Sequence, residues 1–316
     1  MWGSFFVPFS MINTALVSFG MSGKVFHAPF IHTNPNYTLV GAWERSTKQI
    51  TQAYPKTKSF DSYDDILNDP SIDLIIVNSP NDTHFEYTKK AIKAGKHVVT
   101  EKAFTNTYEE ALTLDRLAKE KNVKLAVYHN RRYDADFQTI QQLIKEDQIG
   151  TIQDLHISFE RFRNDLSPKK HKELATPGAG VLFDLGPHLM DQALLFSGIP
   201  EAIFADIRIT RDVSVVDDYF TIIMMYPHHR ITLTSGMVFM QQGPGYKIYG
   251  TKGTFIKDRS DVQENDLIEG RSVLDANWGA ENPSNYGTLS KLESDNSITC
   301  KTIPSIPLPK ALRRIY

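Results

Sequence analysis

Short apolar runs alternate with amphipathic segments through the first 130 residues of this 316-residue chain. The runs are rich in β-branched and aliphatic residues, so they indicate buried strands at 14–17, 37–43, 74–77, 96–100 and 125–128. The segments between them have helical periodicity, from about 23 onward and at 61–67, 83–94 and 107–118. Repeated strand–helix–strand units with short connections predict an α/β fold with a parallel, doubly wound sheet.

The second half of the chain has a different pattern. After a helix near 137–145, alternating strands follow one another closely, at 151–162, 202–211, 218–226, 231–239 and 246–249. Few helices separate them, so they predict an α+β domain built on a largely antiparallel open sheet. One helix is predicted within it, over 184–196, with Pro187 in its first turn. We place the two domains at 11–130 and 131–316.

Composition excludes several classes of protein. The formal net charge of −2 gives no basic surplus for nucleic acid or an anionic membrane. The one cysteine, Cys300, cannot form an internal disulfide and is read as structural, which fits a reducing compartment. Residues 1–12 are apolar but have no positive region or cleavage site, so we expect an extension before a natural start near Met11. We expect a cytoplasmic protein with no membrane span.

A glycine-containing turn follows the first strand and opens a helix. It resembles a dinucleotide fingerprint with its first glycine replaced. Gly20 would let the backbone approach a pyrophosphate, and Gly23 would let the helix pack closely on the strand. The candidate cofactor-binding residues of this turn are Ser18, Gly20, Met21, Ser22 and Gly23.

The end of the second strand carries signals for both coenzymes. Glu44, 21 residues after Gly23, would bond a ribose 2′-hydroxyl and favour NAD. Arg45 and Ser46 follow at once and would embrace a 2′-phosphate, which favours NADP. A solvated Glu44–Arg45 pair is the alternative.

Polar residues also follow the later strands, at the edge where open α/β sheets bind ligands. Glu101 and Lys102 end one buried strand, with a solvated loop pair as the alternative. Ser79, Asn81 and His84 follow another, and with Glu101 and Asn130 they are candidate cofactor-binding residues; His84 would equally pack under the sheet. Asn130 and Arg131 are expected at a ligand-facing hinge, with an interdomain ion-pair cluster as the alternative.

Asp184 and His188 form a second cluster in the C-terminal half. Their four-residue spacing brings the side chains together on a helix, where a carboxylate orients an imidazole and raises its basicity. A capping aspartate and a packed histidine are the alternative. The sequence has no HExxH or paired CxxC motif, so no metal site is expected.

Together these segments resemble the Gfo/Idh/MocA family of NAD(P)-dependent oxidoreductases over nearly the whole chain. The resemblance lies in ALVSFGMSGKVFHAPF (15–30), NDTHFEYTKKAIKAGKHVVTEKAF (81–104), VYHNRRYDADF (127–137) and GAGVLFDLGPHLMDQALLFSG (178–198). Within the family, the chain is most similar to the branch that contains NADP-dependent scyllo-inositol dehydrogenase. The resemblance implies a Rossmann domain and hydride transfer between NAD or NADP and a cyclic polyol or sugar.

The resemblance also assigns roles to residues. Lys102 is implied as the active-site lysine, with Asp184 and His188 as the paired catalytic residues; Arg131 and these three would bind substrate. The C-terminal sheet is implied to form a homodimer or homotetramer. Ser18 and Ala103 depart from the family's glycine and proline, and relatives usually continue beyond Tyr316. These departures leave an alternative, a catalytically impaired dinucleotide-binding protein with a regulatory or assembly role.

Overall fold

The computed structural model describes residues 11–45, 48–167, 172–260 and 262–306. Contacts among these residues divide them into two units. Unit 1 contains 11–128 together with 267–275, and unit 2 contains 129–266 together with 276–306. The short return to unit 1 interrupts the region that the sequence placed wholly in the second domain.

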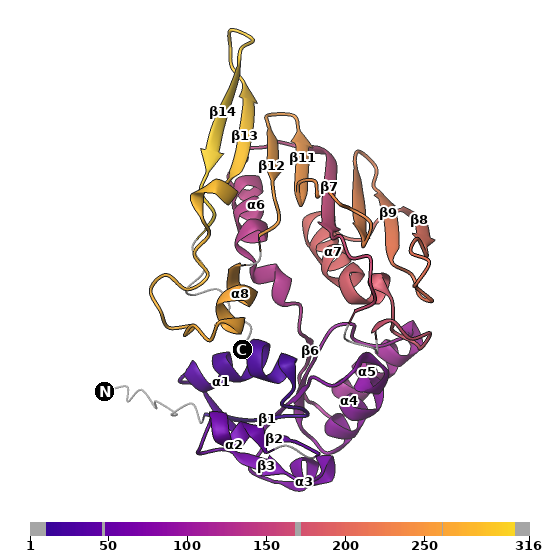
Figure 1. Cartoon of the computed structure of the whole chain (residues 1–316), viewed down its shortest axis with the longest axis vertical. Coiled ribbons are helices and arrows are strands. Elements are labelled where there is room, and N and C mark those ends of the chain that lie inside the picture. Colours follow the sequence, from indigo (N-terminus) through magenta and orange to yellow (C-terminus); the bar gives the residue numbers. More distant parts are fainter. Residues whose placement is uncertain (1–10, 46–47, 168–171, 261, 307–316) are drawn as a thin grey trace, which may run out of the picture. The chain divides into compact units, whose positions relative to one another are not determined.

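Unit 1 is built on a six-stranded parallel sheet in the order β3-β2-β1-β4-β5-β6 (Figure 1). The chain runs outward from β1 to β3 and returns to the other side of β1 with β4, so a topological switch point lies between β1 and β4. The strands are β1 (Ile12–Leu16), β2 (Tyr37–Trp43), β3 (Lys58–Phe60), β4 (Leu74–Val77), β5 (His97–Thr100) and β6 (Leu125–Val127).

Both faces of this sheet are covered, because its strands send alternate side chains into two cores. Ala15 and Ile75 belong to the core shared with α3, α4 and α5, whereas Leu16 and Ile76 belong to the core shared with α1 and α2. This arrangement confirms the predicted doubly wound fold. The helices are η1 (Gly23–His27, a π-helical turn), α1 (Ala28–Thr33), α2 (Gln49–Ala53), α3 (Tyr63–Asn68), η2 (Asn81–Thr83), α4 (His84–Lys93) and α5 (Tyr108–Glu120).

Unit 2 is built on an eight-stranded sheet in the order β14-β13-β12-β11-β7-β10-β9-β8. All neighbouring strands pair antiparallel except β7 and β10, which are parallel, so the predicted largely antiparallel sheet is confirmed. The strands are β7 (Ile152–Glu160), β8 (Ala202–Arg208), β9 (Tyr219–Met225), β10 (Arg230–Gly236), β11 (Tyr246–Gly250), β12 (Thr254–Lys257), β13 (Gly287–Leu292) and β14 (Ile298–Ile303).

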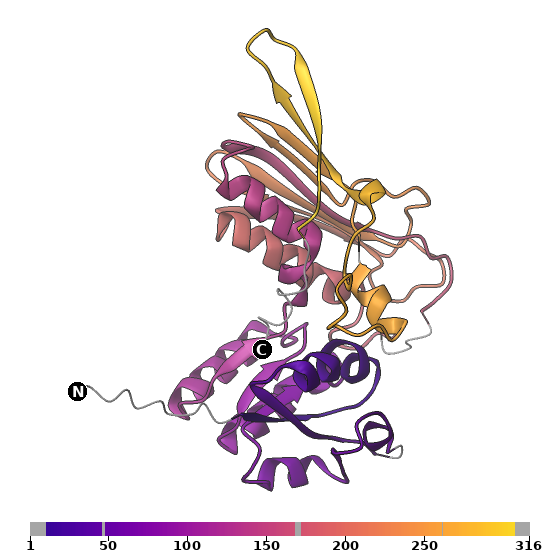
Figure 2. The same ribbon diagram turned by 90° about the vertical axis from the view of Figure 1, so that its left-hand side faces the viewer.

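Two helices, α6 (Ala135–Lys145) and α7 (Val181–Ser197), cover one face of this sheet (Figure 2). Strand residues such as Phe220, Leu233 and Ile248 are buried beneath them. Other helices among the described residues are η3 (Asn130–Tyr133), η5 (Pro283–Asn285) and α8 (Val262–Ile268), whose last two residues belong to unit 1.

Helix α7 begins three residues earlier than expected, so the prediction that Pro187 lies in its first turn was wrong. The helix starts after Gly180, whose φ is +88°, and Pro187 lies inside it. Asp217, which is distant in sequence, caps the first amides of the helix. Its carbonyl accepts a bond from Val181 N (2.9 Å), and its Oδ2 accepts one from Leu182 N (2.7 Å).

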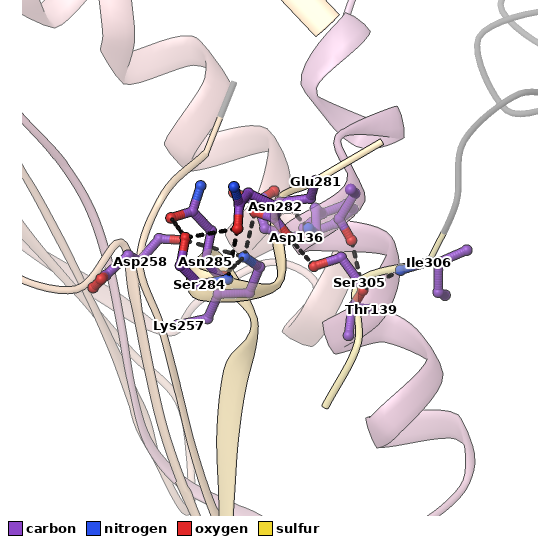
Figure 3. A network of polar contacts seen from close by, with 12 residues as sticks. Asp136, Thr139, Lys257, Asp258, Glu281, Asn282, Ser284, Asn285, Ser305 and Ile306 are labelled. Atoms are coloured by element: carbon purple, nitrogen blue, oxygen red, sulfur yellow. Dashed lines mark hydrogen bonds and ion pairs between the residues drawn. The ribbon is translucent and has the colours of Figure 1, made fainter. Parts of the chain in front are cut away.

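A buried ion pair and its hydrogen bonds fix the end of the described chain, Ser305 and Ile306, within unit 2 (Figure 3). Lys257 Nζ lies 2.7 Å from Glu281 Oε1, and both side chains are almost wholly inaccessible to solvent. Ser305 Oγ also donates to Glu281, and Ile306 N donates to Thr139 Oγ1 of α6 at 3.0 Å. A buried pair is tolerated when further hydrogen bonds satisfy its atoms, as they do here.

Candidate active site

The turn after β1 is clamped to the end of β4 across the switch point. Ser18 N donates to Asn78 Oδ1 (2.9 Å), Asn78 Nδ2 donates to Ser18 O (2.9 Å), and Ser18 Oγ donates to Asn78 O (3.0 Å). A serine therefore fits in place of the expected glycine, because its hydroxyl finds an acceptor and its φ is not positive.

Glycine is needed at the two positions of this turn for different reasons. A Cβ on Gly23 would lie 2.5 Å from Ser18 O, so the helix can approach the strand this closely only with glycine. A Cβ on Gly20 would meet nothing nearer than Ser18 Oγ at 4.0 Å. Lys24 N donates to Gly20 O (3.0 Å), so the helix starts directly beside that open space. An open backbone at a helix N-terminus suits a pyrophosphate, so these residues fit a dinucleotide.

Glu44 does not lie as a solvent-facing ribose ligand. Its side chain is buried, with one oxygen accepting from Gln49 N (2.9 Å) and the other from Ile50 N (3.1 Å) and Ser59 Oγ (3.2 Å). The carboxylate thus satisfies amides at the start of α2 and joins them to β3. Arg45 beside it is exposed, with its guanidinium 5.8 Å from the ring centre of Trp43. Ser46 lies outside the described residues.

A cavity of about 720 Å³ opens between the glycine turn and α2. Its lining combines the aromatic rings of Phe19 and Tyr54 with the ammonium groups of Lys24 and Lys48. Lys24 donates to Gln49, and Lys48 pairs with the exposed Asp61 at 2.5 Å. Aromatic and cationic groups beside a glycine turn are suited to an adenosine and its phosphates.

The carboxylate of Glu101 joins β5 to the first helix of unit 1. Glu101 Oε1 accepts from Ser22 Oγ (2.7 Å) and lies 2.9 Å from His27 Nε2, while Oε2 accepts from Lys102 N (3.2 Å). Burial alone would raise the pKa of Glu101, but the His27 and Ser22 hydrogen bonds and the charges of His27 and Lys102 lower it to about 2. Glu101 is therefore a positioning residue that holds the backbone of Lys102 beside the glycine turn.

His84 holds the opposite side of the lysine loop. Its fully buried ring places Nδ1 2.7 Å from Ala103 O and Nε2 2.8 Å from Ser79 O. Both partners are carbonyl oxygens, so the ring supports the loops after β4 and β5 from beneath. Of the two alternatives that the sequence gave for His84, this position corresponds to packing beneath the sheet. The Lys102–Ala103 peptide bond is cis.

In unit 2, Asp184 and His188 lie one turn apart on α7, and His188 is buried. Asp184 Oδ1 accepts from Lys172 Nζ at 2.5 Å. Asp184 also lines a cavity of about 140 Å³ between the end of β7 and the start of α7. Of the two paired residues, Asp184 therefore reaches a small polar cavity, while His188 is buried one turn further along the helix.

Arg131 is buried within unit 2 and bound by carboxylates of the same unit. Its guanidinium lies 3.3 Å from Asp134 and 3.1 Å from Glu264, and its carbonyl accepts from Gln192 Nε2 (3.1 Å). These contacts give Arg131 a structural ion-pair role inside one unit. Asn130 lies next to it in η3, and Asn81 lies in η2 of unit 1.

Sequence reasoning missed residues that support the site. Asn78 was not singled out, although it forms two hydrogen bonds with the backbone of the glycine turn. His27 and Lys172 were not singled out, although each is bonded to a predicted site residue. Asn78 was recognisable, since it is the first polar residue after a wholly buried strand at the ligand-binding edge.

None of the described helices combines the length and the apolar character needed to cross a membrane. Among the same residues, no group of three or more His, Cys, Asp or Glu side chains is arranged to hold a metal ion.

The strand order of unit 1, the glycine turn at its switch point and the open helix start define a dinucleotide-binding protein of the Rossmann class. Residues 12–129 match the model of an oxidoreductase family with an NAD-binding Rossmann fold, and residues 137–256 match the GFO/IDH/MocA C-terminal domain. The chain belongs to the Gfo/Idh/MocA family of oxidoreductases, with NAD or NADP as coenzyme.

Individual relatives cover most of the chain. Scyllo-inositol 2-dehydrogenase (NADP(+)) IolW of Bacillus subtilis is 37% identical over 295 residues, which are 93% of this chain and 82% of that protein. Among solved structures, the putative oxidoreductase yvaA from Bacillus subtilis has a TM-score of 0.90 at 36% identity, covering 96% of this chain and 86% of that one. A putative oxidoreductase from Bacteroides fragilis has a TM-score of 0.85 at 39% identity, covering 94% and 86%.

Proposed function

We propose that this oxidoreductase interconverts a secondary alcohol and a carbonyl on a cyclic polyol or sugar, an inositol-like molecule. The proposal is carried by the position of Lys102, which follows β5 and whose backbone is bound to Glu101, itself bonded to Ser22 of the glycine turn. The backbone of Lys102 is thereby kept close to the coenzyme turn. The similarity to a scyllo-inositol dehydrogenase supports the substrate class.

In this proposal three residues act on the substrate. His188 accepts the proton of the reacting hydroxyl as a general base, and Asp184, one helical turn before it, orients the imidazole and a neighbouring hydroxyl. Lys102 donates a hydrogen bond to the reacting oxygen and stabilises the negative charge that develops there. The bound coenzyme supplies the nicotinamide carbon that exchanges a hydride with the substrate.

NADP is the coenzyme that the residues after β2 favour. Both oxygens of Glu44 are already bonded to α2 and β3, while Arg45 is exposed. Two lysines, Lys24 and Lys48, line the cavity beside α2. A guanidinium binds a phosphate strongly through paired hydrogen bonds. Calorimetric titration should show NADPH binding about tenfold or more tighter than NADH, and Arg45→Gln should remove most of that difference. Equal affinities in the unmodified protein would contradict this preference.

The reaction is tested by following absorbance at 340 nm with a panel of polyols and both coenzymes. Lys102→Met should lower kcat by about 100-fold or more and leave NADPH affinity within about threefold. Lys93→Met on the exposed surface of α4 is the matched control and should keep full turnover. Tight coenzyme binding without turnover of any polyol would favour the alternative, a binding protein with a regulatory or assembly role.

The edge of the unit 2 sheet also supports the proposed homo-oligomer. Strand β8 exposes Ile203, Phe204 and Ile207, each by 46% or more of its surface. Apolar side chains on a sheet edge favour burial against another chain. We propose that this sheet forms the dimer or tetramer contact, in a cytoplasmic enzyme. Light scattering should then give a mass of two or four chains, and a monomer at micromolar concentration would contradict it.

A further inference from the structure

The small cavity of unit 2 has an unusual density of charge. Eight charged side chains line it, four cationic and four anionic: Arg161, Arg163, Lys172, Arg211, Glu173, Asp184, Asp217 and Asp218. Its volume of about 140 Å³ is smaller than that of a whole ligand site, which is about 300 Å³ or more. A space of this size suits one chemical group of a substrate rather than the complete molecule.

Most of the charges in this cavity already have partners. Arg211 lies 2.8 Å from Asp218 and 3.2 Å from Glu173, and it also donates to two carbonyl oxygens. Lys172 is paired with Asp184 at 2.5 Å. The carboxylate of Asp217 accepts a hydrogen bond from the amide of Leu182 at the start of α7, and burial raises the pKa of this carboxyl. These groups therefore balance one another.

Arg161 and Arg163 are different. Within the part of the chain that the structure describes, neither guanidinium has a hydrogen bond or ion pair with a carboxylate. Arg161 is half-buried against Phe159, with its guanidinium 4.7 Å from the ring centre. Burial lowers the pKa of Arg161, and the charges of the nearby Asp184 and Glu264 offset this effect only in part. The stacking on Phe159 positions the cation without neutralising it.

Local backbone structure points both arginines the same way. Arg161 N donates to Gly236 O and Arg163 N to Met237 O, so the chain stays extended after β7. Side chains two residues apart on an extended chain lie on one side. The intervening Phe162 has 48% of its surface exposed. Both guanidinium groups accordingly line the cavity that contains Asp184.

We propose that this cavity is a subsite for an oxyanion of the substrate, a phosphate monoester or a carboxylate, bound by Arg161 and Arg163. The proposal rests on the proposed function and deepens it, because Asp184 belongs to both the cavity and the catalytic pair. Guanidinium groups bind such oxyanions through paired, charge-assisted hydrogen bonds. The preferred substrate is thus an anionic sugar or polyol, such as a sugar phosphate or a uronate, rather than a neutral one.

The test compares neutral substrates with their anionic derivatives under the same conditions. The panel pairs glucose with glucose 6-phosphate and with glucuronate, and myo-inositol with its monophosphates. One anionic member should exceed its neutral parent in kcat/KM by about tenfold or more, and the phosphate and uronate arms identify the oxyanion. Equal or better turnover of every neutral parent would overturn the proposal.

Variants of the two arginines distinguish a loss of oxyanion binding from a general loss of folding. Arg161→Gln and Arg163→Gln should each lower kcat/KM for the anionic substrate about 10- to 100-fold and change that of its neutral parent less than about threefold. Arg161→Lys should recover part of the loss, and Arg116→Gln on the exposed surface of α5 should change neither. Equal losses on both substrates would contradict the subsite.

A binding measurement does not depend on turnover. Calorimetry with inorganic phosphate and with glucuronate should detect binding of at least one to the NADP-loaded protein, and Arg161→Gln should weaken it about tenfold or more. Arginine-dependent binding without turnover of any alcohol would support the subsite and refute the proposed reaction. Oxidation of neutral polyols without oxyanion binding would support the reaction and refute the subsite.

Discussion

Replacing Glu101 with glutamine should destabilise unit 1 by an amount that depends on pH. The carboxylate accepts from Ser22 and Lys102 and pairs with His27, with only 13% of its side chain exposed. Although burial opposes them, these contacts lower its pKa from the ordinary value of 4.5 to about 2. At 1.36 kcal/mol per unit, this shift corresponds to an upper estimate of about 3 kcal/mol of stability. Glutamine keeps the shape of the side chain but removes its charge.

The sign of the pH dependence follows from the direction of the shift. A carboxyl group with a lowered pKa in the folded protein stabilises it fully above its unfolded pKa of about 4.5. That contribution declines as the pH falls from there towards about 2. The stability difference between the unmodified protein and Glu101→Gln should therefore be constant from pH 7 to pH 5 and then shrink by about 1 kcal/mol per pH unit.

Native-state hydrogen exchange measures this difference within unit 1. Peptides from β1, β4 and β5 should lose about 2–3 kcal/mol of protection at pH 7 in Glu101→Gln. Glu86→Gln is the matched control, because Glu86 has 61% of its side chain exposed and lies 4.0 Å from Lys89; its effect should stay below about 0.5 kcal/mol. Equal losses in the two variants, or a difference that does not shrink at low pH, would refute the reasoning.

Other substitutions separate packing from ligand binding. Gly20→Ala should leave the melting temperature within about 2 °C and weaken NADPH binding, since the space beside it is open in the protein alone. Gly23→Ala should lower stability by about 1–3 kcal/mol, measured by urea unfolding, because its Cβ would lie 2.5 Å from a backbone oxygen. Lys257→Met should lower the free energy of unfolding by about 3–5 kcal/mol, because it leaves Glu281 buried without its cation. An unchanged melting temperature would contradict this prediction.

Sequence patterns predicted the parallel sheet because its central strands are buried on both faces. All four residues of β4 are buried, which gives a continuous apolar run without alternation. The shorter and more exposed elements lacked such a signal. The edge strand β3 has three residues, α2 has five, and nearly every residue of β14 is exposed. Their conformation depends on hydrogen bonds to neighbouring strands, which no local pattern records.

In the candidate site, too, features with a local sequence pattern were predicted and features that depend on partners elsewhere in the chain were not. The edge rule for parallel sheets was sufficient to single out the turn after β1 and the residues that follow β5. It did not give the partners of Glu44, because the nearest of them lie 5, 6 and 15 residues further along the chain. Likewise the start of α7 depends on Asp217, which is distant in sequence, and local spacing therefore misplaced Pro187. Long-range hydrogen bonds decide such details.

The buried state of Glu44 has a consequence for coenzyme engineering. Redesign of Rossmann enzymes begins at the acidic position after the second strand, on the assumption that it reads the ribose. In this chain the same carboxylate accepts from two amides at the start of α2, so its removal should weaken the helix whose residues line the neighbouring cavity. Cofactor swaps should instead be sought at the solvent-facing Arg45 and Lys48, where charge can be altered without disturbing the scaffold.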